Sequence, residues 1–175
     1  MGMEEFSIPI FIRGVKMSKE NEIGFSLIEL LIVVAILGIL MAVAVPNLLA
    51  AKRAANEGSA MSSLRTIHSC ELTYQATTGV GTYGDLPALA VDTLTDSVLG
   101  SGSKSGYNFV ITPTLPGAVP QLYHASGVPI VPAGMSRTGT RRFGITEDGV
   151  LHGDSIALTP YATNAAVKAA QAIGN

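Results

Sequence analysis

Gly24-Phe25-Ser26-Leu27-Ile28-Glu29 introduces an uncharged apolar run of 22 residues, Leu30 to Ala51, that is rich in Leu, Ile, Val and Ala. An α-helix rises about 1.5 Å per residue, so about 20 apolar residues cross the hydrocarbon core of a bilayer. The run therefore predicts a single transmembrane helix near the N-terminus of the chain.

Two features separate this segment from an ordinary anchor or secretory signal. Glu29 places a carboxylate about one turn inside the apolar segment, where a charge is costly unless it is paired or functional. A secretory signal is cut after its apolar core, at small residues. Here the obvious processing point, Gly24, precedes the apolar core, so the helix is expected to remain in the mature chain.

The stretch from Gly24 to Val34 resembles the processing motif of type IV prepilins and of the related type II secretion pseudopilins. It has the cleavage-site Gly24, then Phe25 as the new N-terminus, and Glu29 as the fifth mature residue before a long apolar helix. The resemblance implies that a prepilin peptidase cuts between Gly24 and Phe25 and N-methylates Phe25. It also implies that the mature helix packs in the core of a filament.

A physical argument supports a role for Glu29 in assembly. Cleavage leaves a positively charged amine on Phe25, which needs a partner when the helix moves from lipid into a protein core. Glu29 of a neighbouring subunit supplies that partner, and this favours one axial register because an unpaired buried charge costs several kcal/mol. A head-to-tail contact that does not close then propagates as an open helical polymer. The alternative is a plain anchor whose Glu29 reaches the headgroups.

The segment before the helix is predicted to be a cleaved leader, residues 1–24, with Met17 as an alternative start because residues 17–24 form a compact leader of the kind this family uses. The net charge of the whole chain is −2, which gives no broad basic surface for nucleic acid. Lys and Arg are about equally frequent before and after the helix, so their distribution does not indicate how the helix is oriented in the membrane. Only the family resemblance places the C-terminal side outside the cytoplasm.

The helix is expected to continue past the membrane, because apolar residues recur there at helical spacing. This stripe is Ala60, Leu64, Ile67, Cys70 and Tyr74. One helix of about 50 residues results, with residues 25–51 as the membrane or filament-core half and residues 52–78 as the amphipathic half. Pro46 predicts a kink, and Gly38 is a second weak point. The family resemblance implies local melting between Gly38 and Pro46 in the filament.

Residues 79–175 are predicted to form a globular α+β head with a small antiparallel sheet. The strand candidates are Tyr107–Ile111, Gln121–Ala125, and a hairpin of Arg141–Thr146 and Val150–His152 turning at Glu147-Asp148-Gly149. A short helix is expected after Pro87, a flexible turn over Gly100–Gly106, and a C-terminal helix over Asn164–Ile173 with Asn164 as its N-cap. The fold class is α+β: a long hydrophobic helix, kinked near Pro46, packed against a pilin-like sheet.

The sequence offers weak candidates for other sites. Cys70 is the only cysteine, so no intramolecular disulfide forms, and its place on the apolar stripe predicts a buried thiol. Asp148 and Asp154 are candidates for a Ca²⁺ site of the kind found in the resembled major pseudopilins, with plain surface carboxylates as the alternative. Arg141 and Arg142 either contact DNA or an acidic neighbour or blunt the edge of a strand.

No catalytic site is predicted. The three histidines, His68, His124 and His152, are scattered and match no metal or nucleophile motif. The turn around Lys104 is not a phosphate loop, since Ser103 stands where that motif requires Gly. The chain is therefore expected to be a non-enzymatic protein without a cofactor.

The function that follows from the resemblance is a structural subunit of a type IV pilus. Its implied partners are identical subunits in a helical homopolymer, a prepilin peptidase, and the pilus assembly platform with its ATPase. The subunit is expected as a single-pass inner-membrane protein before assembly and in an extracellular pilus afterwards. The alternatives are a major pseudopilin of a type II secretion system, in a periplasmic pseudopilus, and a minor pilin for adhesion or DNA uptake.

Overall fold

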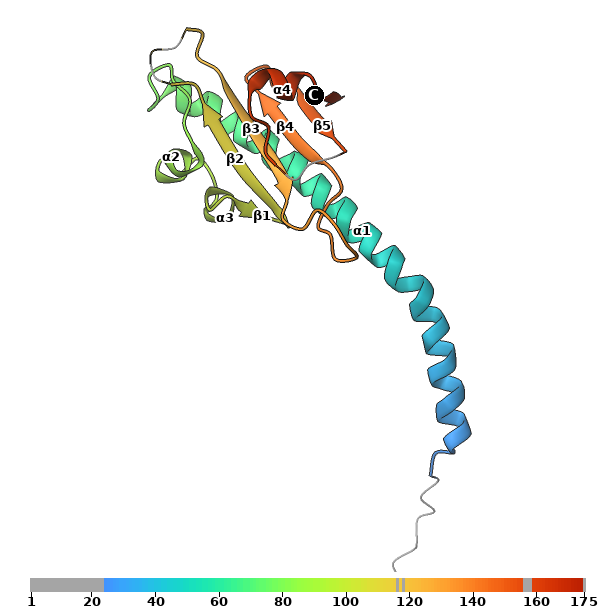
Figure 1. Ribbon diagram of the computed structural model, residues 1–175. Helices are drawn as coiled ribbons and strands as arrows, with labels where there is room; N and C mark the ends of the chain where they lie inside the picture. The colour runs from blue at the N-terminus through green and yellow to red at the C-terminus, as the bar shows by residue number, and fades with distance from the viewer. Residues whose placement is uncertain (1–23, 116, 118, 156–158, 175) are drawn as a thin grey trace, which may run out of the picture. The chain divides into compact units, whose positions relative to one another are not determined.

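The computed structural model of the protein describes residues 24–115, 117, 119–155 and 159–174, so the predicted leader before Gly24 and the alternative start Met17 lie outside the described residues. The chain divides into two compact units, Met1–Leu40 and Met41–Asn175. Figure 1 shows the helices and strands that make up each unit.

Helix α1, Leu27–Ala76, confirms the predicted long helix and contains Pro46 within it. It begins two residues after Phe25, and the kink at Pro46 remains a prediction. The helix is long and apolar enough to cross a membrane, and none of the residues in its most apolar stretch is buried. Its first half therefore exposes an apolar surface that no other described residue buries.

The second half of α1 is amphipathic, as its spacing predicts. Ala60, Leu64 and Ile67 are fully buried, and Cys70 is nearly so. Tyr74 is partly buried against the same core. The stripe faces the head because apolar residues three and four apart fall on one side of a helix.

The head sheet is a simple antiparallel meander. Among the described residues it has six strands in the order β1-β2-β3-β4-β5-β6, so that each strand pairs with its neighbours in sequence. The strands are β1 Ser103–Lys104, β2 Tyr107–Pro113, β3 Tyr123–Pro129, β4 Arg142–Thr146, β5 Leu151–Asp154 and β6 Gln171–Gly174. The short helices are α2 Leu86–Val91, α3 Ser97–Gly100 and α4 Asn164–Lys168.

One face of the sheet packs on the buried stripe of α1, as predicted, and Figure 1 shows β2 and β3 lying over the C-terminal part of that helix. Strand β2 alternates buried and exposed residues, which is the pattern of a strand with one face on a core. The inward side chains come from four strands: Tyr107, Phe109, Ile111, Tyr123, Ala125, Phe143, Ile145 and Leu151. Leu86, Leu89 and Leu99 from α2 and α3 complete the core.

Strand β3 is buried along its whole length because the C-terminal segment covers its outer face. The ring of His124 lies against the Tyr161 carbonyl at 3.1 Å, and the Tyr161 N–H donates to Ser126 Oγ at 3.1 Å. Gly144 lies directly beneath this cover, since a Cβ there would come within 2.9 Å of the Tyr161 ring. Tyr161 and Val167, both buried, give the outer face a small core of its own.

The predicted C-terminal helix is wrong in its extent and its cap. Helix α4 ends at Lys168, and Gln171–Gly174 is strand β6 instead, paired with β5. The N-cap is Thr163, whose Oγ1 accepts the Ala166 N–H at 3.1 Å. Asn164 does not cap the helix; its side-chain amide donates a hydrogen bond to the Tyr123 carbonyl instead. An Ala-rich run has high helix propensity, but strand pairing along the free edge of β5 overrides it.

Several strand boundaries also differ from the prediction. β3 begins at Tyr123 and continues to Pro129, beyond the predicted end at Ala125. Ser126 and Gly127 have low strand propensity. Gly127 nevertheless fits the strand because it lies under the Phe109 ring, and a Cβ at this position would be 3.0 Å from that ring. The predicted flexible turn over Gly100–Gly106 contains the short strand β1. The expected helix near Pro87 is α2, and α3 was not predicted.

The hairpin turn at Glu147-Asp148-Gly149 is confirmed between β4 and β5, although β5 begins at Leu151 and ends at Asp154. Gly149 has φ 73°, a left-handed conformation that favours glycine. A Cβ at this position would also lie 2.9 Å from His68 Nε2 on α1. The glycine therefore lets the turn approach the helix closely.

Candidate functional site

The N-terminal unit carries the predicted processing and assembly residues at the start of α1. Gly24, Phe25 and Ser26 precede the helix in a non-helical segment, and Phe25 is exposed. Glu29 lies in the first turn, and its Oε2 accepts a hydrogen bond from the Ser26 backbone N–H at 3.1 Å. The predicted peptidase site is thus an exposed peptide bond directly in front of a helix.

This hydrogen bond is half of a capping box, in which a glutamate at the third helical position satisfies the N–H of the N-cap residue. Sequence reasoning treated Glu29 only as a charge for a neighbouring subunit and missed this local role. The spacing Ser26-x-x-Glu29 is the signal that reveals it. Negative charge in the first turn also opposes the partial positive charge of a helix N-terminus, so Glu29 has a partner within its own chain.

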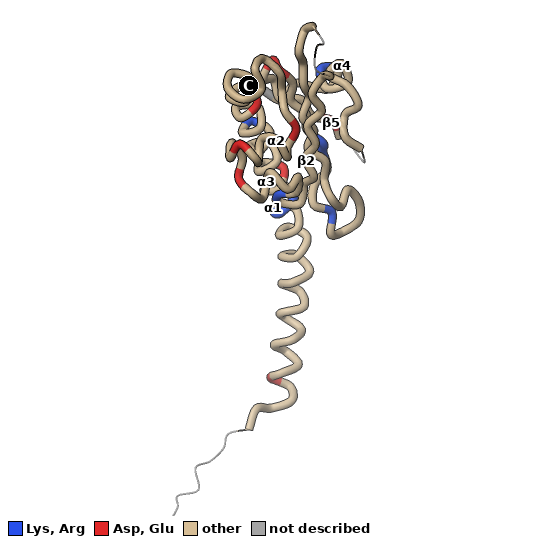
Figure 2. Tube along the Cα trace, turned by 90° about the vertical axis from the view of Figure 1, so that its left-hand side faces the viewer, with Lys and Arg blue, Asp and Glu red and all other residues tan. Residues whose placement is uncertain are grey.

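The apolar part of α1 is exposed except at Leu49, which is half-buried, and Glu29 is the only charged residue between Gly24 and Ala51. Figure 2 shows this directly: the lower part of the helix carries one acidic position near its start and no basic one. Gly38 lies on this open surface, since nothing lies within 4 Å of a Cβ built there. The local melting assigned to Gly38 and Pro46 remains a prediction.

Glu57 fastens the base of the head to α1. Its carboxylate accepts hydrogen bonds from the Thr140 N–H at 2.8 Å, the Thr140 hydroxyl at 2.5 Å and Arg141 Nε at 3.0 Å. Burial alone would raise the pKa of Glu57, but the hydrogen bonds from Thr140 and Arg141 outweigh it and hold the pKa below its usual value. Glu57 is therefore a charged structural anchor.

Glu71 lies on the same helix, is fully buried, and has much poorer surroundings. Its Oε2 accepts the Gly84 N–H at 3.0 Å, while Oε1 has no hydrogen-bond partner among the described residues. Burial raises the pKa of Glu71 to about 7, and the nearby charge of Asp85 acts in the same direction. The carboxyl group holds the loop after α1 but, among the residues that the structure describes, has no cationic partner of the kind Glu57 has.

The remaining candidate side chains serve packing. Cys70 is buried as predicted, its thiol donates to the Leu94 carbonyl at 2.9 Å, and burial raises its pKa. His68 Nδ1 lies 2.6 Å from the Tyr123 hydroxyl, and burial lowers the pKa of His68. The rings of His124 and His152 contact the C-terminal segment at Asn164 and Ala170. The three histidines remain in separate places, without a shared site.

The two Ca²⁺ candidates lie at opposite ends of the β4–β5 hairpin. Asp148 is in the turn, where its Oδ1 accepts from Thr146 and from the Val150 N–H. Asp154 pairs with Arg142 across the open end, at 3.0 Å. Among the described residues no three His, Cys, Asp or Glu side chains come together as a metal site. Ca²⁺ binding by this pair remains a prediction, and each carboxylate has a structural task.

The interpretation of Arg141 and Arg142 as residues that blunt a sheet edge is wrong, because β4 lies between β3 and β5. Arg141 pairs with Glu57 on α1 and lies 5.2 Å from the centre of the Phe143 ring. Arg142 stacks on the Tyr161 ring at 4.0 Å and donates to the Thr159 carbonyl at 3.0 Å. Both arginines hold segments of the head together.

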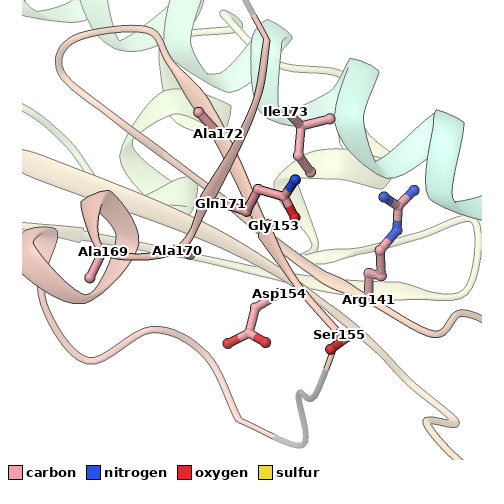
Figure 3. Close-up of a pocket in the computed structure, with 9 residues that line it drawn as sticks. All are labelled: Arg141, Gly153, Asp154, Ser155, Ala169, Ala170, Gln171, Ala172 and Ile173. Atoms are coloured by element: carbon pink, nitrogen blue, oxygen red, sulfur yellow. The ribbon is translucent and has the colours of Figure 1, made fainter.

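A hollow of about 580 Å³ lies beside β5 and β6, and Figure 3 shows the residues that line it. Arg141 extends toward α1 and Asp154 extends to the other side of the strands. Each is already paired, Arg141 with Glu57 and Asp154 with Arg142. The hollow therefore presents no converging set of charged groups for a ligand among the described residues.

The predicted processing motif thus lies in front of a membrane-capable helix, and the second half of that helix packs on an antiparallel sheet. The family model described as the prokaryotic N-terminal methylation motif matches residues 21–45. The chain is 65% identical over 37 residues to the type IV wide pilus major component PilA4 of Thermus thermophilus. That match covers 21% of this chain and 28% of the relative. No solved structure matches the chain significantly.

Proposed function

We propose that the protein is a structural subunit of a type IV pilus filament, processed between Gly24 and Phe25 and polymerised through α1. The observation that carries the proposal is the exposed, uncharged helix surface from Leu30 to Ala51 behind the single carboxylate of Glu29. An apolar surface of that length requires lipid or other helices around it. The similarity of the N-terminal region to a wide pilus major component supports the filament over other uses of such a helix.

In this proposal the subunit first lies in the inner membrane through the apolar half of α1. The prepilin peptidase removes the leader and methylates the new Phe25 amine. The assembly platform and its ATPase then move the subunit from the membrane into an extracellular homopolymer. The head supplies stable packing on the other half of α1, so the same helix serves both as anchor and as filament core.

The charge of Glu29 registers neighbouring subunits by pairing with the Phe25 amine of an adjacent chain. The capping hydrogen bond from Ser26 offers Glu29 a local role that does not need a neighbour. These two roles make different demands on the side chain, because the cap needs only an acceptor oxygen whereas the pair needs a negative charge.

The deciding experiment is intact-mass and N-terminal analysis of protein sheared from cells, compared with the membrane fraction. Abundant sheared protein that begins at methylated Phe25 is the expected result. Mature protein confined to the membrane would indicate the pseudopilin alternative, and mature protein at a few copies per filament would indicate a minor pilin. A chain that retains its leader in every fraction would overturn the family interpretation.

Glu29→Ala and Glu29→Gln separate the two roles of this side chain. Both variants should be cut at Gly24, and both should reduce filament yield by at least about tenfold, since an unpaired amine in the core costs several kcal/mol. Glu29→Gln keeps an acceptor oxygen for the Ser26 N–H but lacks the charge. Normal filaments from Glu29→Gln, counted by electron microscopy, would show that the charge is not needed for registration.

Gly24→Ile tests the assigned cleavage site. The peptide bond after Gly24 is exposed and non-helical, so a bulky β-branched side chain is expected to block the peptidase at the bond itself. The expected product is an uncut precursor in the membrane fraction. Ser26→Ala, two residues after the site, is the matched control that should still be cut. Mature protein of normal mass from Gly24→Ile would refute the assignment.

A further inference from the structure

The loop between β3 and β4 carries a group of exposed apolar side chains. Met135 is 77% exposed, Ile130 46% and Val131 37%. Single apolar residues on a protein surface are ordinary, but these three fall within six residues of one connection. A group of exposed apolar side chains in one loop indicates a surface that is covered by a partner.

The loop is closed on itself and fixed at its base. Thr138 and Val131 are joined by a backbone hydrogen bond from the Thr138 N–H to the Val131 carbonyl at 2.8 Å. Asn56 Nδ2 on α1 donates to the Thr138 carbonyl at 2.8 Å, and Glu57 holds Thr140 immediately after it. These bonds fix the loop against one point on α1, and they leave residues 132–137 as a protruding tip.

That point on α1 lies just beyond the apolar run. Asn56 and Glu57 are five and six residues after Ala51, a distance of about 8 Å along an α-helix. Figure 1 shows the β3–β4 loop at the end of the head from which α1 leaves toward its N-terminus. A bilayer that surrounds the helix up to Ala51 therefore has its headgroup layer at the level of this loop.

The charges around this end are basic and unpaired. Lys52 and Arg53 follow Ala51 directly, and Arg137 lies in the loop tip. None of these three forms an ion pair with another described residue, whereas Lys104, Arg141, Arg142 and Lys168 all do. Lys and Arg at a membrane interface extend their charged ends to lipid phosphates while their stems cover apolar surface.

From this arrangement we infer that the β3–β4 loop is a membrane-contact site, which inserts Met135 and Ile130 into the headgroup layer while Arg137, Lys52 and Arg53 bind lipid phosphates. The inference rests on the proposed function, since it requires α1 to lie in a bilayer before assembly. It adds a second point of attachment, so that the head is held against the membrane surface by a site that must release when the subunit is extracted.

The occupant is a phospholipid surface rather than a second copy for two reasons. The site adjoins the helix segment that is itself expected in lipid, and its unpaired charges are all cationic. Apolar side chains beside Lys and Arg are the composition of segments that lie in a bilayer interface. Asp85, Asp92 and Asp96 lie at the caps of α2 and α3, and Glu57, the acidic residue next to this site, is already paired with Arg141.

The test uses the full mature chain reconstituted in vesicles. The sequence contains no tryptophan, so Met135→Trp creates a single fluorescent probe at the loop tip. Val80→Trp is the matched control, because Val80 is 87% exposed in the loop that follows the other end of α1. Lipids brominated close to the headgroup should quench the Met135→Trp variant several-fold more than the Val80→Trp variant. Equal quenching of the two variants would overturn the inference.

Leu40→Trp distinguishes failure of the site from failure of the proposed function, because Leu40 is in the apolar part of α1. Deep brominated lipids that quench Leu40→Trp but spare Met135→Trp would leave the anchor intact and reject the contact site. If neither variant is quenched, the helix is not in the bilayer and both proposals fall.

The cationic contribution is tested by adding Arg137→Glu to the Met135→Trp variant. Quenching should increase about twofold or more when phosphatidylglycerol is mixed into phosphatidylcholine vesicles, and Arg137→Glu should remove this increase. An increase that persists with Arg137→Glu would reject the phosphate contact. A spectrum that changes with protein density at constant lipid composition would indicate contact with a second copy instead, which would also overturn the inference.

Discussion

Glu57 and Glu71 are two buried glutamates on the head-facing side of α1, fourteen residues apart, and they lie in opposite surroundings. Glu57 accepts three hydrogen bonds, one of them from the guanidinium of Arg141. Glu71 accepts one, from the Gly84 N–H, and its second oxygen has no partner among the described residues. One helix thus carries a well-compensated carboxylate at the base of the head and a poorly compensated one at its other end.

The difference shows that burial alone does not decide what a charged residue contributes. Burial tends to raise the pKa of both groups, but only Glu57 has donors that reverse the effect. Glu57 should therefore stabilise the head as an anion, and Glu71 should favour its neutral form. Substitutions that remove each charge are expected to have opposite signs.

Glu57→Ala should produce the largest effect, a loss of about 3 kcal/mol in the free energy of unfolding. Removing one partner of a buried pair costs 3–5 kcal/mol, and the lower end applies because the Arg141 side chain is 42% exposed. Urea unfolding of the detergent-solubilised mature chain, followed by tyrosine absorbance, measures it. Glu57→Gln, which keeps an acceptor for Thr140, should lose less. Equal losses would mean that the acceptor for Thr140 contributes nothing and that the charge pair with Arg141 accounts for the whole effect.

Glu71 should make the stability of the head depend on pH. Its pKa is about 7 in the folded chain against an ordinary 4.5, so between these values the folded state holds a proton that the unfolded state has released. Stability should therefore fall as the pH rises from about 4.5 to about 7 and level off above it. The difference between 4.5 and about 7 corresponds to about 3–4 kcal/mol, since one pKa unit is about 1.4 kcal/mol.

Glu71→Gln should remove most of this slope and stabilise the head at pH 8 by about 2 kcal/mol, somewhat less than the full shift because the amide still leaves one buried group short of partners. Unfolding curves at a series of pH values provide the measurement. The Glu57→Gln variant at the same pH values is the matched comparison. A slope that survives in Glu71→Gln would assign the pH dependence to another group.

Lys104→Met should have the smallest effect on stability. It extends the comparison of the two buried glutamates to an ion pair at the surface. Lys104 pairs with Asp96 at 2.7 Å, but the Asp96 side chain is 51% exposed, and an ion pair in contact with solvent is screened and contributes little. The Asp96 cap on the Leu99 N–H remains in this variant. We expect no measurable change in the urea midpoint. A clear loss would indicate that the charge of Lys104 acts on more than Asp96.

Much of this architecture is predictable from the sequence where one physical signal dominates. The apolar run, the buried stripe from Ala60 to Cys70 and the hairpin turn at Gly149 each rest on an unopposed pattern of hydrophobicity or turn chemistry. The C-terminal helix fails because propensity and strand pairing compete, and pairing with β5 is a long-range contact that local sequence does not encode. Strand β3 extends past Ala125 because Phe109 covers Gly127, which is likewise visible only in three dimensions.

In the candidate site too, the sequence reveals the local features but not the long-range contacts. The motif from Gly24 to Glu29 is local and is readable from the sequence, as is the Ser26–Glu29 spacing that sequence reasoning overlooked. The pairing of Arg141 with Glu57 joins residues more than eighty positions apart, so no spacing rule reveals it. The same long-range contacts position the loop tip around Met135.

The C-terminal segment closes the outer face of the sheet with hydrogen bonds to His124 and Ser126 and with the Tyr161 ring stacked on Arg142. None of these contacts involves sulfur chemistry, and the single thiol, Cys70, lies on the opposite side of the sheet, on α1. Closure of the head is therefore independent of oxidants and of disulfide-forming enzymes. The same folded head should form in reducing and oxidising surroundings. Its maturation should therefore not depend on the redox state of the compartment that receives it.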